Sequence, residues 1–306
     1  MRTTRPFRPT RRTGVLVCIV LALVVCAATV SAAVLPDRPG APAPSGTAAS
    51  SAGPRPTDPT RDPSKSPDPT DGTAPVRVML VGDSVTQGAR GDATWRYLLW
   101  ERLQALGVDV DLVGPYRGVR YQAPDGSITH YDGGYRFPDF DTDHASKWGL
   151  EVADIPGIDG WMRTFRPDVV VLALGVNDLL TGTTPEQTAG LVEQRIATMR
   201  SVDPDVDVVL SAPTQTWVAG VPAYARLLAD LALRLDTATS RVDLAPAPPG
   251  YAQGVHTYDL LHPNPVGEEL IMRSVLDGLL ASGAVTPTAV ADPASDVSGC
   301  WRERCP

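Results

Sequence analysis

Histidine and cysteine are both scarce in this chain of 306 residues, which contains four of each. Cys18 and Cys26 lie in an apolar N-terminal segment, whereas Cys300 and Cys305 lie in a polar C-terminal tail over residues 284–306. Two thiols without a nearby histidine are too few ligands for a zinc site. We therefore expect Cys300 and Cys305 to form a disulfide in an oxidising compartment, and we assign the tail no function.

Basic clusters are absent from the sequence after the first 13 residues, and the formal net charge is −8. A protein that binds nucleic acid normally carries a basic patch, so we expect no nucleic-acid partner. The arginines of residues 1–13 precede residues 14–35, which contain no charged side chain. This charge-free run is the basis for the predicted cellular location of the protein.

A basic start, an apolar run and the small residues Ser31, Ala32 and Ala33 are typical of a secretory signal peptide. We favour cleavage near Ala32 or Ala33. The run of 22 residues is also long enough to span a bilayer, with the arginines retained inside. Residues 1–35 are therefore predicted to be a signal peptide or a membrane anchor. The remaining chain is expected to be secreted or extracellular, or to be anchored in the membrane through residues 14–35.

Large apolar residues are almost missing from residues 36–75, where Pro, Ser, Thr, Asp, Gly and Ala dominate. Such a segment cannot bury enough surface to offset the entropy lost on ordering, so we expect a disordered linker. One folded domain is expected over residues 76–283, and we expect the protein to be a monomer.

Beyond the linker, short apolar runs alternate with segments of helical periodicity. Strands are expected at residues 76–81, 108–113, 168–174, 206–212 and 241–244, and helices at residues 94–106, 150–165, 185–201, 221–237 and 264–281. This alternation predicts an α/β fold, a three-layer αβα sandwich with a parallel, flavodoxin-like sheet of about five strands. Such sheets bind ligands at the carboxyl ends of their strands.

Polar residues that suit acyl transfer lie in three segments, two directly after expected strands and one before the last expected helix. Ser84 lies in GDSVTQG after the first strand, Asn177 lies in GVND after the third strand, and DLLHPN before the last helix contains Asp259 and His262. Each segment alone has an ordinary explanation as a helix cap or a turn. Together they supply a nucleophile, an oxyanion donor, a base and an orienting acid at one edge of the sheet.

These three segments, in this order, closely resemble the first, third and fifth conserved blocks of the SGNH (GDSL-like) hydrolases. The resemblance covers about residues 76–281. It implies that Ser84 is the nucleophile, that His262 is the general base and that Asp259 orients it. It also implies an oxyanion hole formed by the N–H of Ser84, the side chain of Asn177 and a glycine N–H. Gly149 is the best candidate for that glycine, with Gly118, Gly133 and Gly134 as rivals, and Asp83 and Asp178 are expected to brace loops.

The resemblance implies a serine esterase that needs no metal and no organic cofactor. We expect the substrate to be a small-molecule or polysaccharide ester, and we favour short acyl groups. A lysophospholipase or lipase for longer acyl chains is one alternative, and a non-catalytic glycan-binding surface module is another. His256 is a rival base, but it has no aspartate three residues before it.

An unusually long connection over residues 116–148 holds seven aromatic residues. It is expected either to roof the active site and bind a sugar or acyl group, or to form a satellite hydrophobic cluster. Within it, Asp139, Asp141 and Asp143 resemble the start of a calcium loop. The sixth and twelfth positions hold His144 and Leu150 instead of the required glycine and glutamate, so we expect a solvated acidic loop.

Overall fold

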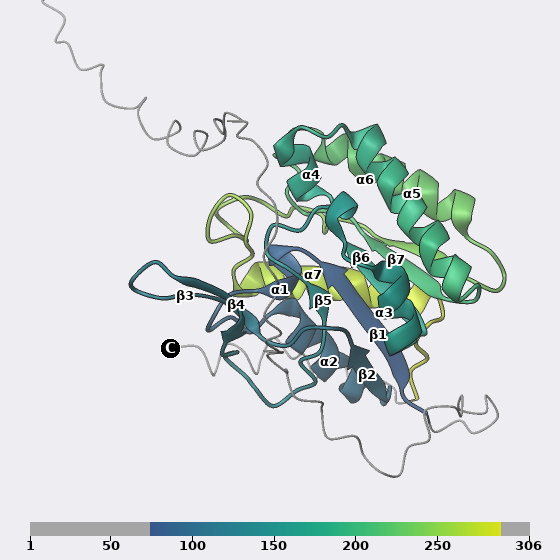
Figure 1. The fold of residues 1–306 in the computed structure, drawn as a ribbon, viewed down its shortest axis with the longest axis horizontal. Helices are drawn as coiled ribbons and strands as arrows, with labels where there is room; N and C mark the ends of the chain where they lie inside the picture. Colours follow the sequence, from purple (N-terminus) through teal and green to yellow (C-terminus); the bar gives the residue numbers. More distant parts are fainter. Residues whose placement is uncertain (1–73, 289–306) are drawn as a thin grey trace, which may run out of the picture. The chain divides into compact units, whose positions relative to one another are not determined.

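The computed structural model describes residues 74–288 (Figure 1). The predicted N-terminal segment over residues 1–35, nearly all of the predicted linker and the proposed pair Cys300 and Cys305 lie outside the described residues. The central sheet contains β1 (Val76–Gly82), β2 (Val110–Val113), β5 (Ala145–Ser146), β6 (Val169–Ala173), β7 (Asp207–Ser211) and β8 (Val242–Ala245).

The strand order of the sheet is β2-β1-β6-β7-β8, and all of these neighbours are parallel. Numbered along the chain, these five strands therefore have the order 2-1-3-4-5 of a flavodoxin-like sheet, which confirms the predicted fold class. The short strand β5 pairs with the end of β1, where Ala145 lies opposite Val81. This pairing brings the segment after β5 to the carboxyl end of β1.

Helices cover both faces of the sheet (Figure 1). One face packs against α2 (Trp95–Ala105) and α7 (Pro265–Ala281), and the other packs against α3 (Ile158–Phe165), α5 (Pro185–Val202) and α6 (Val221–Leu235). Side chains of β1 alternate between the two cores: Val78 and Leu80 face α2 and α7, whereas Met79 and Val81 face the other helices. All four are fully buried, as expected for a parallel strand covered on both faces.

The expected helix over residues 150–165 is wrong in its first half. Residues Val152–Asp154 form a single 3₁₀ turn, and α3 begins only at Ile158. Pro156 pushes the residue before it, Ile155, to an extended conformation with ψ 112°, and Gly157 has a left-handed φ of 56°. A continuous α-helix cannot pass through these residues, so the loop before α3 stays irregular.

The long connection over residues 116–148 is more regular than expected. It contains an antiparallel hairpin of β3 (Val119–Gln122) and β4 (Ile128–Gly133), followed by β5. Most of its aromatic residues form satellite clusters. Phe137 stacks on Tyr97 of α2 with ring centroids 5.0 Å apart, and Tyr116 stacks on Tyr131 at 4.4 Å. Phe137 and Phe140 also pack against the core under α2, and binding of a sugar or acyl group by the connection stays a prediction.

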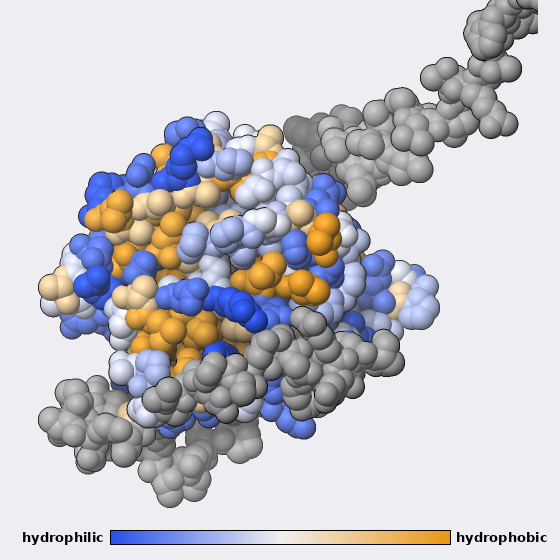
Figure 2. Space-filling model, turned by 180° about the vertical axis from the view of Figure 1, so that it is seen from behind, coloured by the Kyte–Doolittle hydropathy of each residue, from blue (hydrophilic) through white to orange (hydrophobic). Residues whose placement is uncertain are grey.

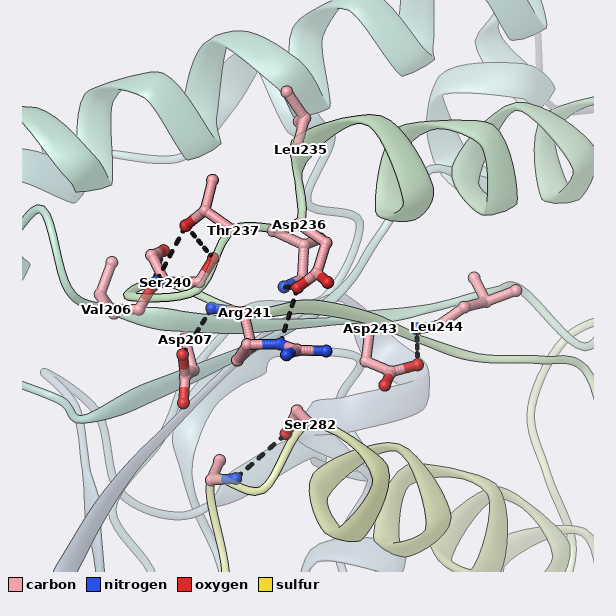
Figure 3. A network of polar contacts seen from close by, with 12 residues as sticks. Val206, Asp207, Leu235, Asp236, Thr237, Ser240, Arg241, Asp243, Leu244 and Ser282 are labelled. Carbon is pink, nitrogen blue, oxygen red and sulfur yellow. Dashed lines mark hydrogen bonds and ion pairs between the residues drawn. The ribbon is translucent and has the colours of Figure 1, made fainter.

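The amino ends of β7 and β8 are joined by a polar network (Figure 3). Asp207 accepts a 2.7 Å hydrogen bond from the backbone N–H of Arg241, whose guanidinium lies 2.8 Å from Asp236. Thr237 donates to the carbonyl of Ser240 at 2.9 Å. This network ties the turn before β8 to the sheet at the edge opposite to the one where the functional segments meet.

Several hydrophobic patches remain on the surface, separated by polar residues on the face seen in Figure 2. Four exposed hydrophobic residues belong to one stretch of the chain, residues 255–266, and they are Val255, Tyr258, Leu260 and Val266. Within residues 74–288, every helix is too short or too polar to cross a lipid bilayer.

Candidate active site

Ser84 is held at the carboxyl end of β1 by a tight turn into the short helix α1 (Ser84–Gln87). Gly82 is required in this turn, because a Cβ atom there would lie 2.1 Å from the hydroxyl oxygen of Thr86. Asp83 caps α1 by accepting a 2.9 Å hydrogen bond from the N–H of Val85. These contacts fix the backbone of Ser84, which is the first residue of α1 and lies at the carboxyl end of β1.

His262 and Asp259 complete a hydrogen-bonded chain with Ser84. The Nε2 atom of His262 lies 3.0 Å from the hydroxyl oxygen of Ser84, and its Nδ1 atom lies 2.8 Å from Oδ2 of Asp259. The second carboxylate oxygen, Oδ1, accepts 2.8 Å hydrogen bonds from the N–H groups of Leu261 and His262. The three predicted residues therefore meet in the geometry of a nucleophile, a base and an orienting acid.

The carboxyl group of Asp259 is in the state needed to stabilise a positively charged imidazole. Partial burial works to raise the pKa of Asp259, but the backbone and side-chain hydrogen bonds from His262 and the N–H of Leu261 outweigh it. The net result is a pKa below the usual value, so the carboxylate is ionised at neutral pH. An ionised Asp259 favours the imidazole tautomer with its proton on Nδ1, which leaves Nε2 as the hydrogen-bond acceptor for the Ser84 hydroxyl.

Trp148 packs directly on the imidazole of His262, with ring centroids 4.4 Å apart and an interplanar angle of 26°. Its backbone N–H donates a 2.7 Å hydrogen bond to Gln87 at the end of α1. The guanidinium of Arg120 in β3 lies 4.6 Å from the Trp148 ring centroid. The sequence identified Trp148 only as one of many aromatic residues, and nothing in it pointed to Arg120.

Asn177 lies in α4 (Val176–Thr181), directly after β6, so the structure places it at the same edge as Ser84. Its side-chain nitrogen donates to Oδ2 of Asp83 at 3.3 Å and to the carbonyl of Leu150 at 3.2 Å. Both bonds are long for N–H···O hydrogen bonds. The amide is thus oriented by Asp83 on the nucleophile turn and by the segment that follows Gly149.

Gly149 lies between two residues that contact the site, Trp148 and Leu150. It has a left-handed φ of 75°, and no described atom would obstruct a Cβ atom there. Its N–H has no hydrogen-bond partner among the described residues. The rival Gly118 is instead packed against Tyr131 of the hairpin, Gly133 ends β4, and Gly134 uses its carbonyl to accept from Gly91. Gly149 is thus the glycine whose surroundings fit the prediction.

Asp83 and Asp178 are buried and brace loops, as expected. Burial raises the pKa of Asp83 to about 7, against the lowering effect of the Val85 N–H, and the negative charge of Asp178 adds to the rise. Asp178 accepts the N–H of Val152 with both oxygens, at 3.1 and 3.2 Å, and burial raises its pKa. Neither carboxylate faces the hydroxyl of Ser84 in the way that His262 does.

His256 does not take part in this arrangement. Its Nδ1 atom accepts a 2.9 Å hydrogen bond from the N–H of Ala252, and its ring lies 5.2 Å from that of Tyr251. His144 is buried beneath the hairpin, and burial holds its pKa well below the usual value. His262 is therefore the histidine that the fold brings to Ser84.

The acidic loop around Asp141 is used for hydrogen bonds. Asp141 accepts a 2.7 Å bond from the N–H of Leu112, and Asp143 pairs with Arg117. Among residues 74–288, no group of three or more His, Cys, Asp or Glu side chains is placed to hold a metal ion.

A cavity of about 170 Å³ opens beside Ser84 and His262. Trp148 and Tyr258 form part of its wall, and two carboxyl side chains, Asp92 and Glu268, line it as well. Neither residue could be predicted from the sequence. They lie outside the three motif segments, and no spacing or periodicity signals that they would meet.

Comparison with known proteins agrees with this geometry. Residues 80–270 match the GDSL-like Lipase/Acylhydrolase family. A family 3 carbohydrate esterase from Talaromyces cellulolyticus is 29% identical, with 67% of this chain and 97% of that chain aligned and a TM-score of 0.56. An acetyl esterase mutant crystallised with an acetate ion is 27% identical, with 67% and 97% aligned and a TM-score of 0.55. None of the curated proteins compared with the chain matches it.

Proposed function

Because the chain belongs to the GDSL-like lipase/acylhydrolase family, we propose that it hydrolyses carboxylic esters by nucleophilic attack of Ser84. The observation that carries this proposal is the linked set of Ser84, His262 and Asp259, with contacts of 3.0 and 2.8 Å. A surface module that only binds glycans would not require a serine, an imidazole and a carboxylate in this alignment.

In the first step, Ser84 attacks the acyl carbonyl while Nε2 of His262 takes its proton. The Asp259 carboxylate stabilises the imidazolium that forms. His262 then gives the proton to the alcohol oxygen as the ester C–O bond breaks. In the second step, His262 activates a water molecule, which releases the acid and returns the proton to Ser84. Neither step consumes a cofactor.

The oxyanion of each tetrahedral intermediate is stabilised by the N–H groups of Ser84 and Gly149 and by the amide of Asn177. The Asn177 amide now makes two hydrogen bonds of 3.2 and 3.3 Å. Bonds of that length are readily exchanged for a shorter charge-assisted bond to an oxyanion. Preorganised donors of this kind usually supply the largest single part of the rate enhancement.

We propose that the acyl group is short and that the alcohol is a carbohydrate. The restricted cavity of about 170 Å³ beside Ser84 and His262 supports an alcohol of limited size, such as a sugar. Two structural relatives above 25% identity also support the proposal, since one is named a carbohydrate esterase and the other an acetyl esterase.

The exposed hydrophobic residues of the 255–266 segment favour a second candidate, a lipase or lysophospholipase for longer acyl chains. They surround the loop that carries His262, and Tyr258 is 66% exposed and Leu260 48% exposed. Rates measured with p-nitrophenyl esters of increasing acyl length separate the two candidates. A maximum at acetyl or propionyl supports the first, and a maximum at long chains supports the second.

The direct test of the chemistry is the variant Ser84→Ala. We expect it to abolish release of p-nitrophenol from p-nitrophenyl acetate and labelling by a fluorophosphonate probe. The matched control is Ser201→Ala, because Ser201 is exposed on α5 and contacts only Thr198 in the same helix. Full hydrolysis by a folded Ser84→Ala protein would refute the assignment, and a wild-type protein that is never labelled would favour a purely binding role.

We further propose that the enzyme acts outside the cytoplasm, on the strength of the arginines and the charge-free run at its N-terminus. N-terminal sequencing of the mature protein distinguishes the two possibilities for this segment. A new N-terminus near Ala32 or Ala33 indicates a cleaved signal peptide, whereas an intact N-terminus in the membrane fraction indicates an anchor.

A further inference from the structure

Two carboxyl side chains in the active-site cavity, the half-buried Asp92 and the buried Glu268, have no part in the proposed mechanism. Asp92 precedes α2, and Glu268 lies in the first turn of α7, only 4% exposed. The two residues are 176 positions apart in sequence, from 92 to 268, and meet only because α2 and α7 pack on the same face of the sheet. Charged side chains are rarely buried without a purpose, because burial disfavours their ionised form.

Each carboxyl group uses one oxygen to hold the local backbone. Oδ2 of Asp92 accepts a 2.7 Å hydrogen bond from the N–H of Ala89, and Oε2 of Glu268 accepts from the N–H of Trp95. The other oxygens, Oδ1 of Asp92 and Oε1 of Glu268, have no hydrogen-bond partner among the described residues. The cavity therefore offers two unused acceptor positions next to Ser84.

Burial makes it unfavourable for either carboxyl group to ionise without a hydrogen-bond donor beside its second oxygen. Burial raises the pKa of Glu268 well above its usual value, and the negative charge of Asp92 adds to the rise. Burial also raises the pKa of Asp92, while its backbone bond to Ala89 and the nearby His262 work against the rise. A bound group that donates hydrogen bonds would stabilise the ionised form of both carboxyl groups, which burial disfavours.

The cavity lies on the leaving-group side of the nucleophile. Its lining includes Ser84 and His262 but neither Asn177 nor Gly149, the candidate oxyanion residues. His262 must give its proton to the departing alcohol oxygen, so the alcohol part of the ester lies on the imidazole side. The unused acceptors of Asp92 and Glu268 are thus placed to contact the alcohol and not the acyl group.

The size of the cavity agrees with one sugar ring. An apolar protein cavity of about 150 Å³ is known to hold benzene, a six-membered ring. The volume of about 170 Å³ beside Ser84 is similar. Trp148 contributes to the wall of the cavity, although the two faces of its ring are covered by His262 and by the guanidinium of Arg120.

We propose that Asp92 and Glu268 form a specificity subsite that accepts hydrogen bonds from the free hydroxyl groups of a sugar ring, the alcohol part of the ester substrate. This inference rests on the proposed ester hydrolysis by Ser84. The subsite would give esters of hydroxyl-bearing alcohols a higher kcat/KM than esters of apolar alcohols of the same size.

The test compares two acetate esters whose alcohols have rings of similar size, a methyl glucopyranoside monoacetate and cyclohexyl acetate. Wild-type enzyme is expected to have a kcat/KM for the sugar acetate about tenfold or more above that for cyclohexyl acetate. This ratio is expected to fall by about tenfold in Asp92→Asn and further in the double variant with Glu268→Gln. Amide side chains keep the oxygens that accept from Ala89 and Trp95, so the fold is retained.

Glu269→Gln is the matched control, because Glu269 is the next residue of α7 and pairs with Arg273 outside the cavity. Its ratio is expected to equal that of wild type. An unchanged ratio in active, folded Asp92→Asn and in the double variant overturns the subsite. A wild-type preference for acetylcholine over the sugar acetate also overturns it, because the carboxyl groups would then be selecting a cation.

A binding measurement separates this inference from the proposed chemistry. In Ser84→Ala, tryptophan fluorescence reports binding of the sugar acetate without turnover. Weaker binding by about tenfold when Asp92→Asn is added supports the subsite even if hydrolysis by Ser84 is refuted. Equal binding with and without Asp92→Asn rejects the subsite, whatever the hydrolytic activity of the wild type.

Discussion

The indole ring of Trp148 lies flat against the imidazole of His262, with centroids 4.4 Å apart and 26° between the planes. The indole is itself held from two sides, by the hydrogen bond from its backbone to Gln87 and by the guanidinium of Arg120. The face of the imidazole is therefore supported by a residue that is not part of the Ser84, His262 and Asp259 chain.

Removing this support is expected to lower kcat more than it changes KM. Trp148→Ala frees the imidazole to leave its line with Ser84, and a displacement of about 1 Å can reduce the rate by about 10²-fold. Trp148→Phe keeps a stacking ring and is expected to retain most of the activity. Steady-state kinetics with p-nitrophenyl acetate check this, and equal kcat values for the Ala and Phe variants would contradict it.

The orienting role of Asp259 predicts a large effect of Asp259→Asn. An amide can still accept from the N–H of Leu261, but it cannot stabilise the imidazolium or secure the correct tautomer. We expect kcat to fall by about 10²-fold or more. Because the Asp259 side chain is 56% exposed, solvent screening makes the loss smaller than for a fully buried carboxylate. Asp230→Asn, at an exposed position of α6, is the control and should behave as wild type.

Asn177 is expected to act on the transition state and not on substrate binding. Asn177→Ala should lower kcat by about 10²–10³-fold with little change in KM, because the amide contacts the oxyanion only after attack. A variant that raises KM and keeps kcat would show instead that Asn177 binds the ground state. Circular dichroism of the variant is needed beside the kinetics, since Asn177 also contacts Asp83 and Leu150.

Asp83 predicts a pH dependence of stability. Its pKa is about 7 in the folded protein and near 3.8 when unfolded, so between these values the folded state holds a proton that the unfolded state lacks. Stability from this group therefore falls as pH rises, by about 1.4 kcal/mol per pH unit. Between pH 5 and 8 the loss is about 2–3 kcal/mol, because it ends once the folded group ionises near pH 7.

The variant Asp83→Asn isolates this contribution, since it cannot ionise. Urea unfolding of both proteins at pH 5 and pH 8 is expected to show the variant gaining stability relative to wild type at the higher pH. The comparison cancels the opposite trend from neutral, buried His144 at lower pH. Parallel pH profiles for the two proteins would mean that Asp83 does not titrate in this range.

The sheet and the meeting of Ser84, Asn177 and His262 could be predicted because both depend on local pattern. Apolar runs such as residues 76–81 mark parallel strands, and parallel strands bring the residues after them to one edge. The break at Pro156 and Gly157 was overlooked, although both residues disfavour a continuous helix. The hairpin β3–β4 was missed although VRYQ in β3 alternates apolar and polar residues, because strands of four and six residues give only a short pattern.

Tertiary packing determined what the sequence could not reveal. Asp92 and Glu268 lie in one cavity only because α2 and α7 are neighbours, and the stack of Trp148 on His262 depends on β5 pairing with β1. Neither relationship leaves a signal in residue spacing. Gly149 stays a prediction among four candidate glycines, and what favours it is that its neighbours Trp148 and Leu150 contact His262 and Asn177.

The loop that carries Asp259 and His262 is closed on itself. Its two ends pair between Thr257 and Pro263, and the N–H of Tyr258 donates to the carbonyl of His262 at 2.9 Å. The base and its acid partner thus form a local unit, whereas Ser84 is 178 residues away. A displacement of this loop would switch the enzyme off by separating the proton acceptor from the hydroxyl. The contact of Nδ1 with Asp259 lies inside the loop and would be kept.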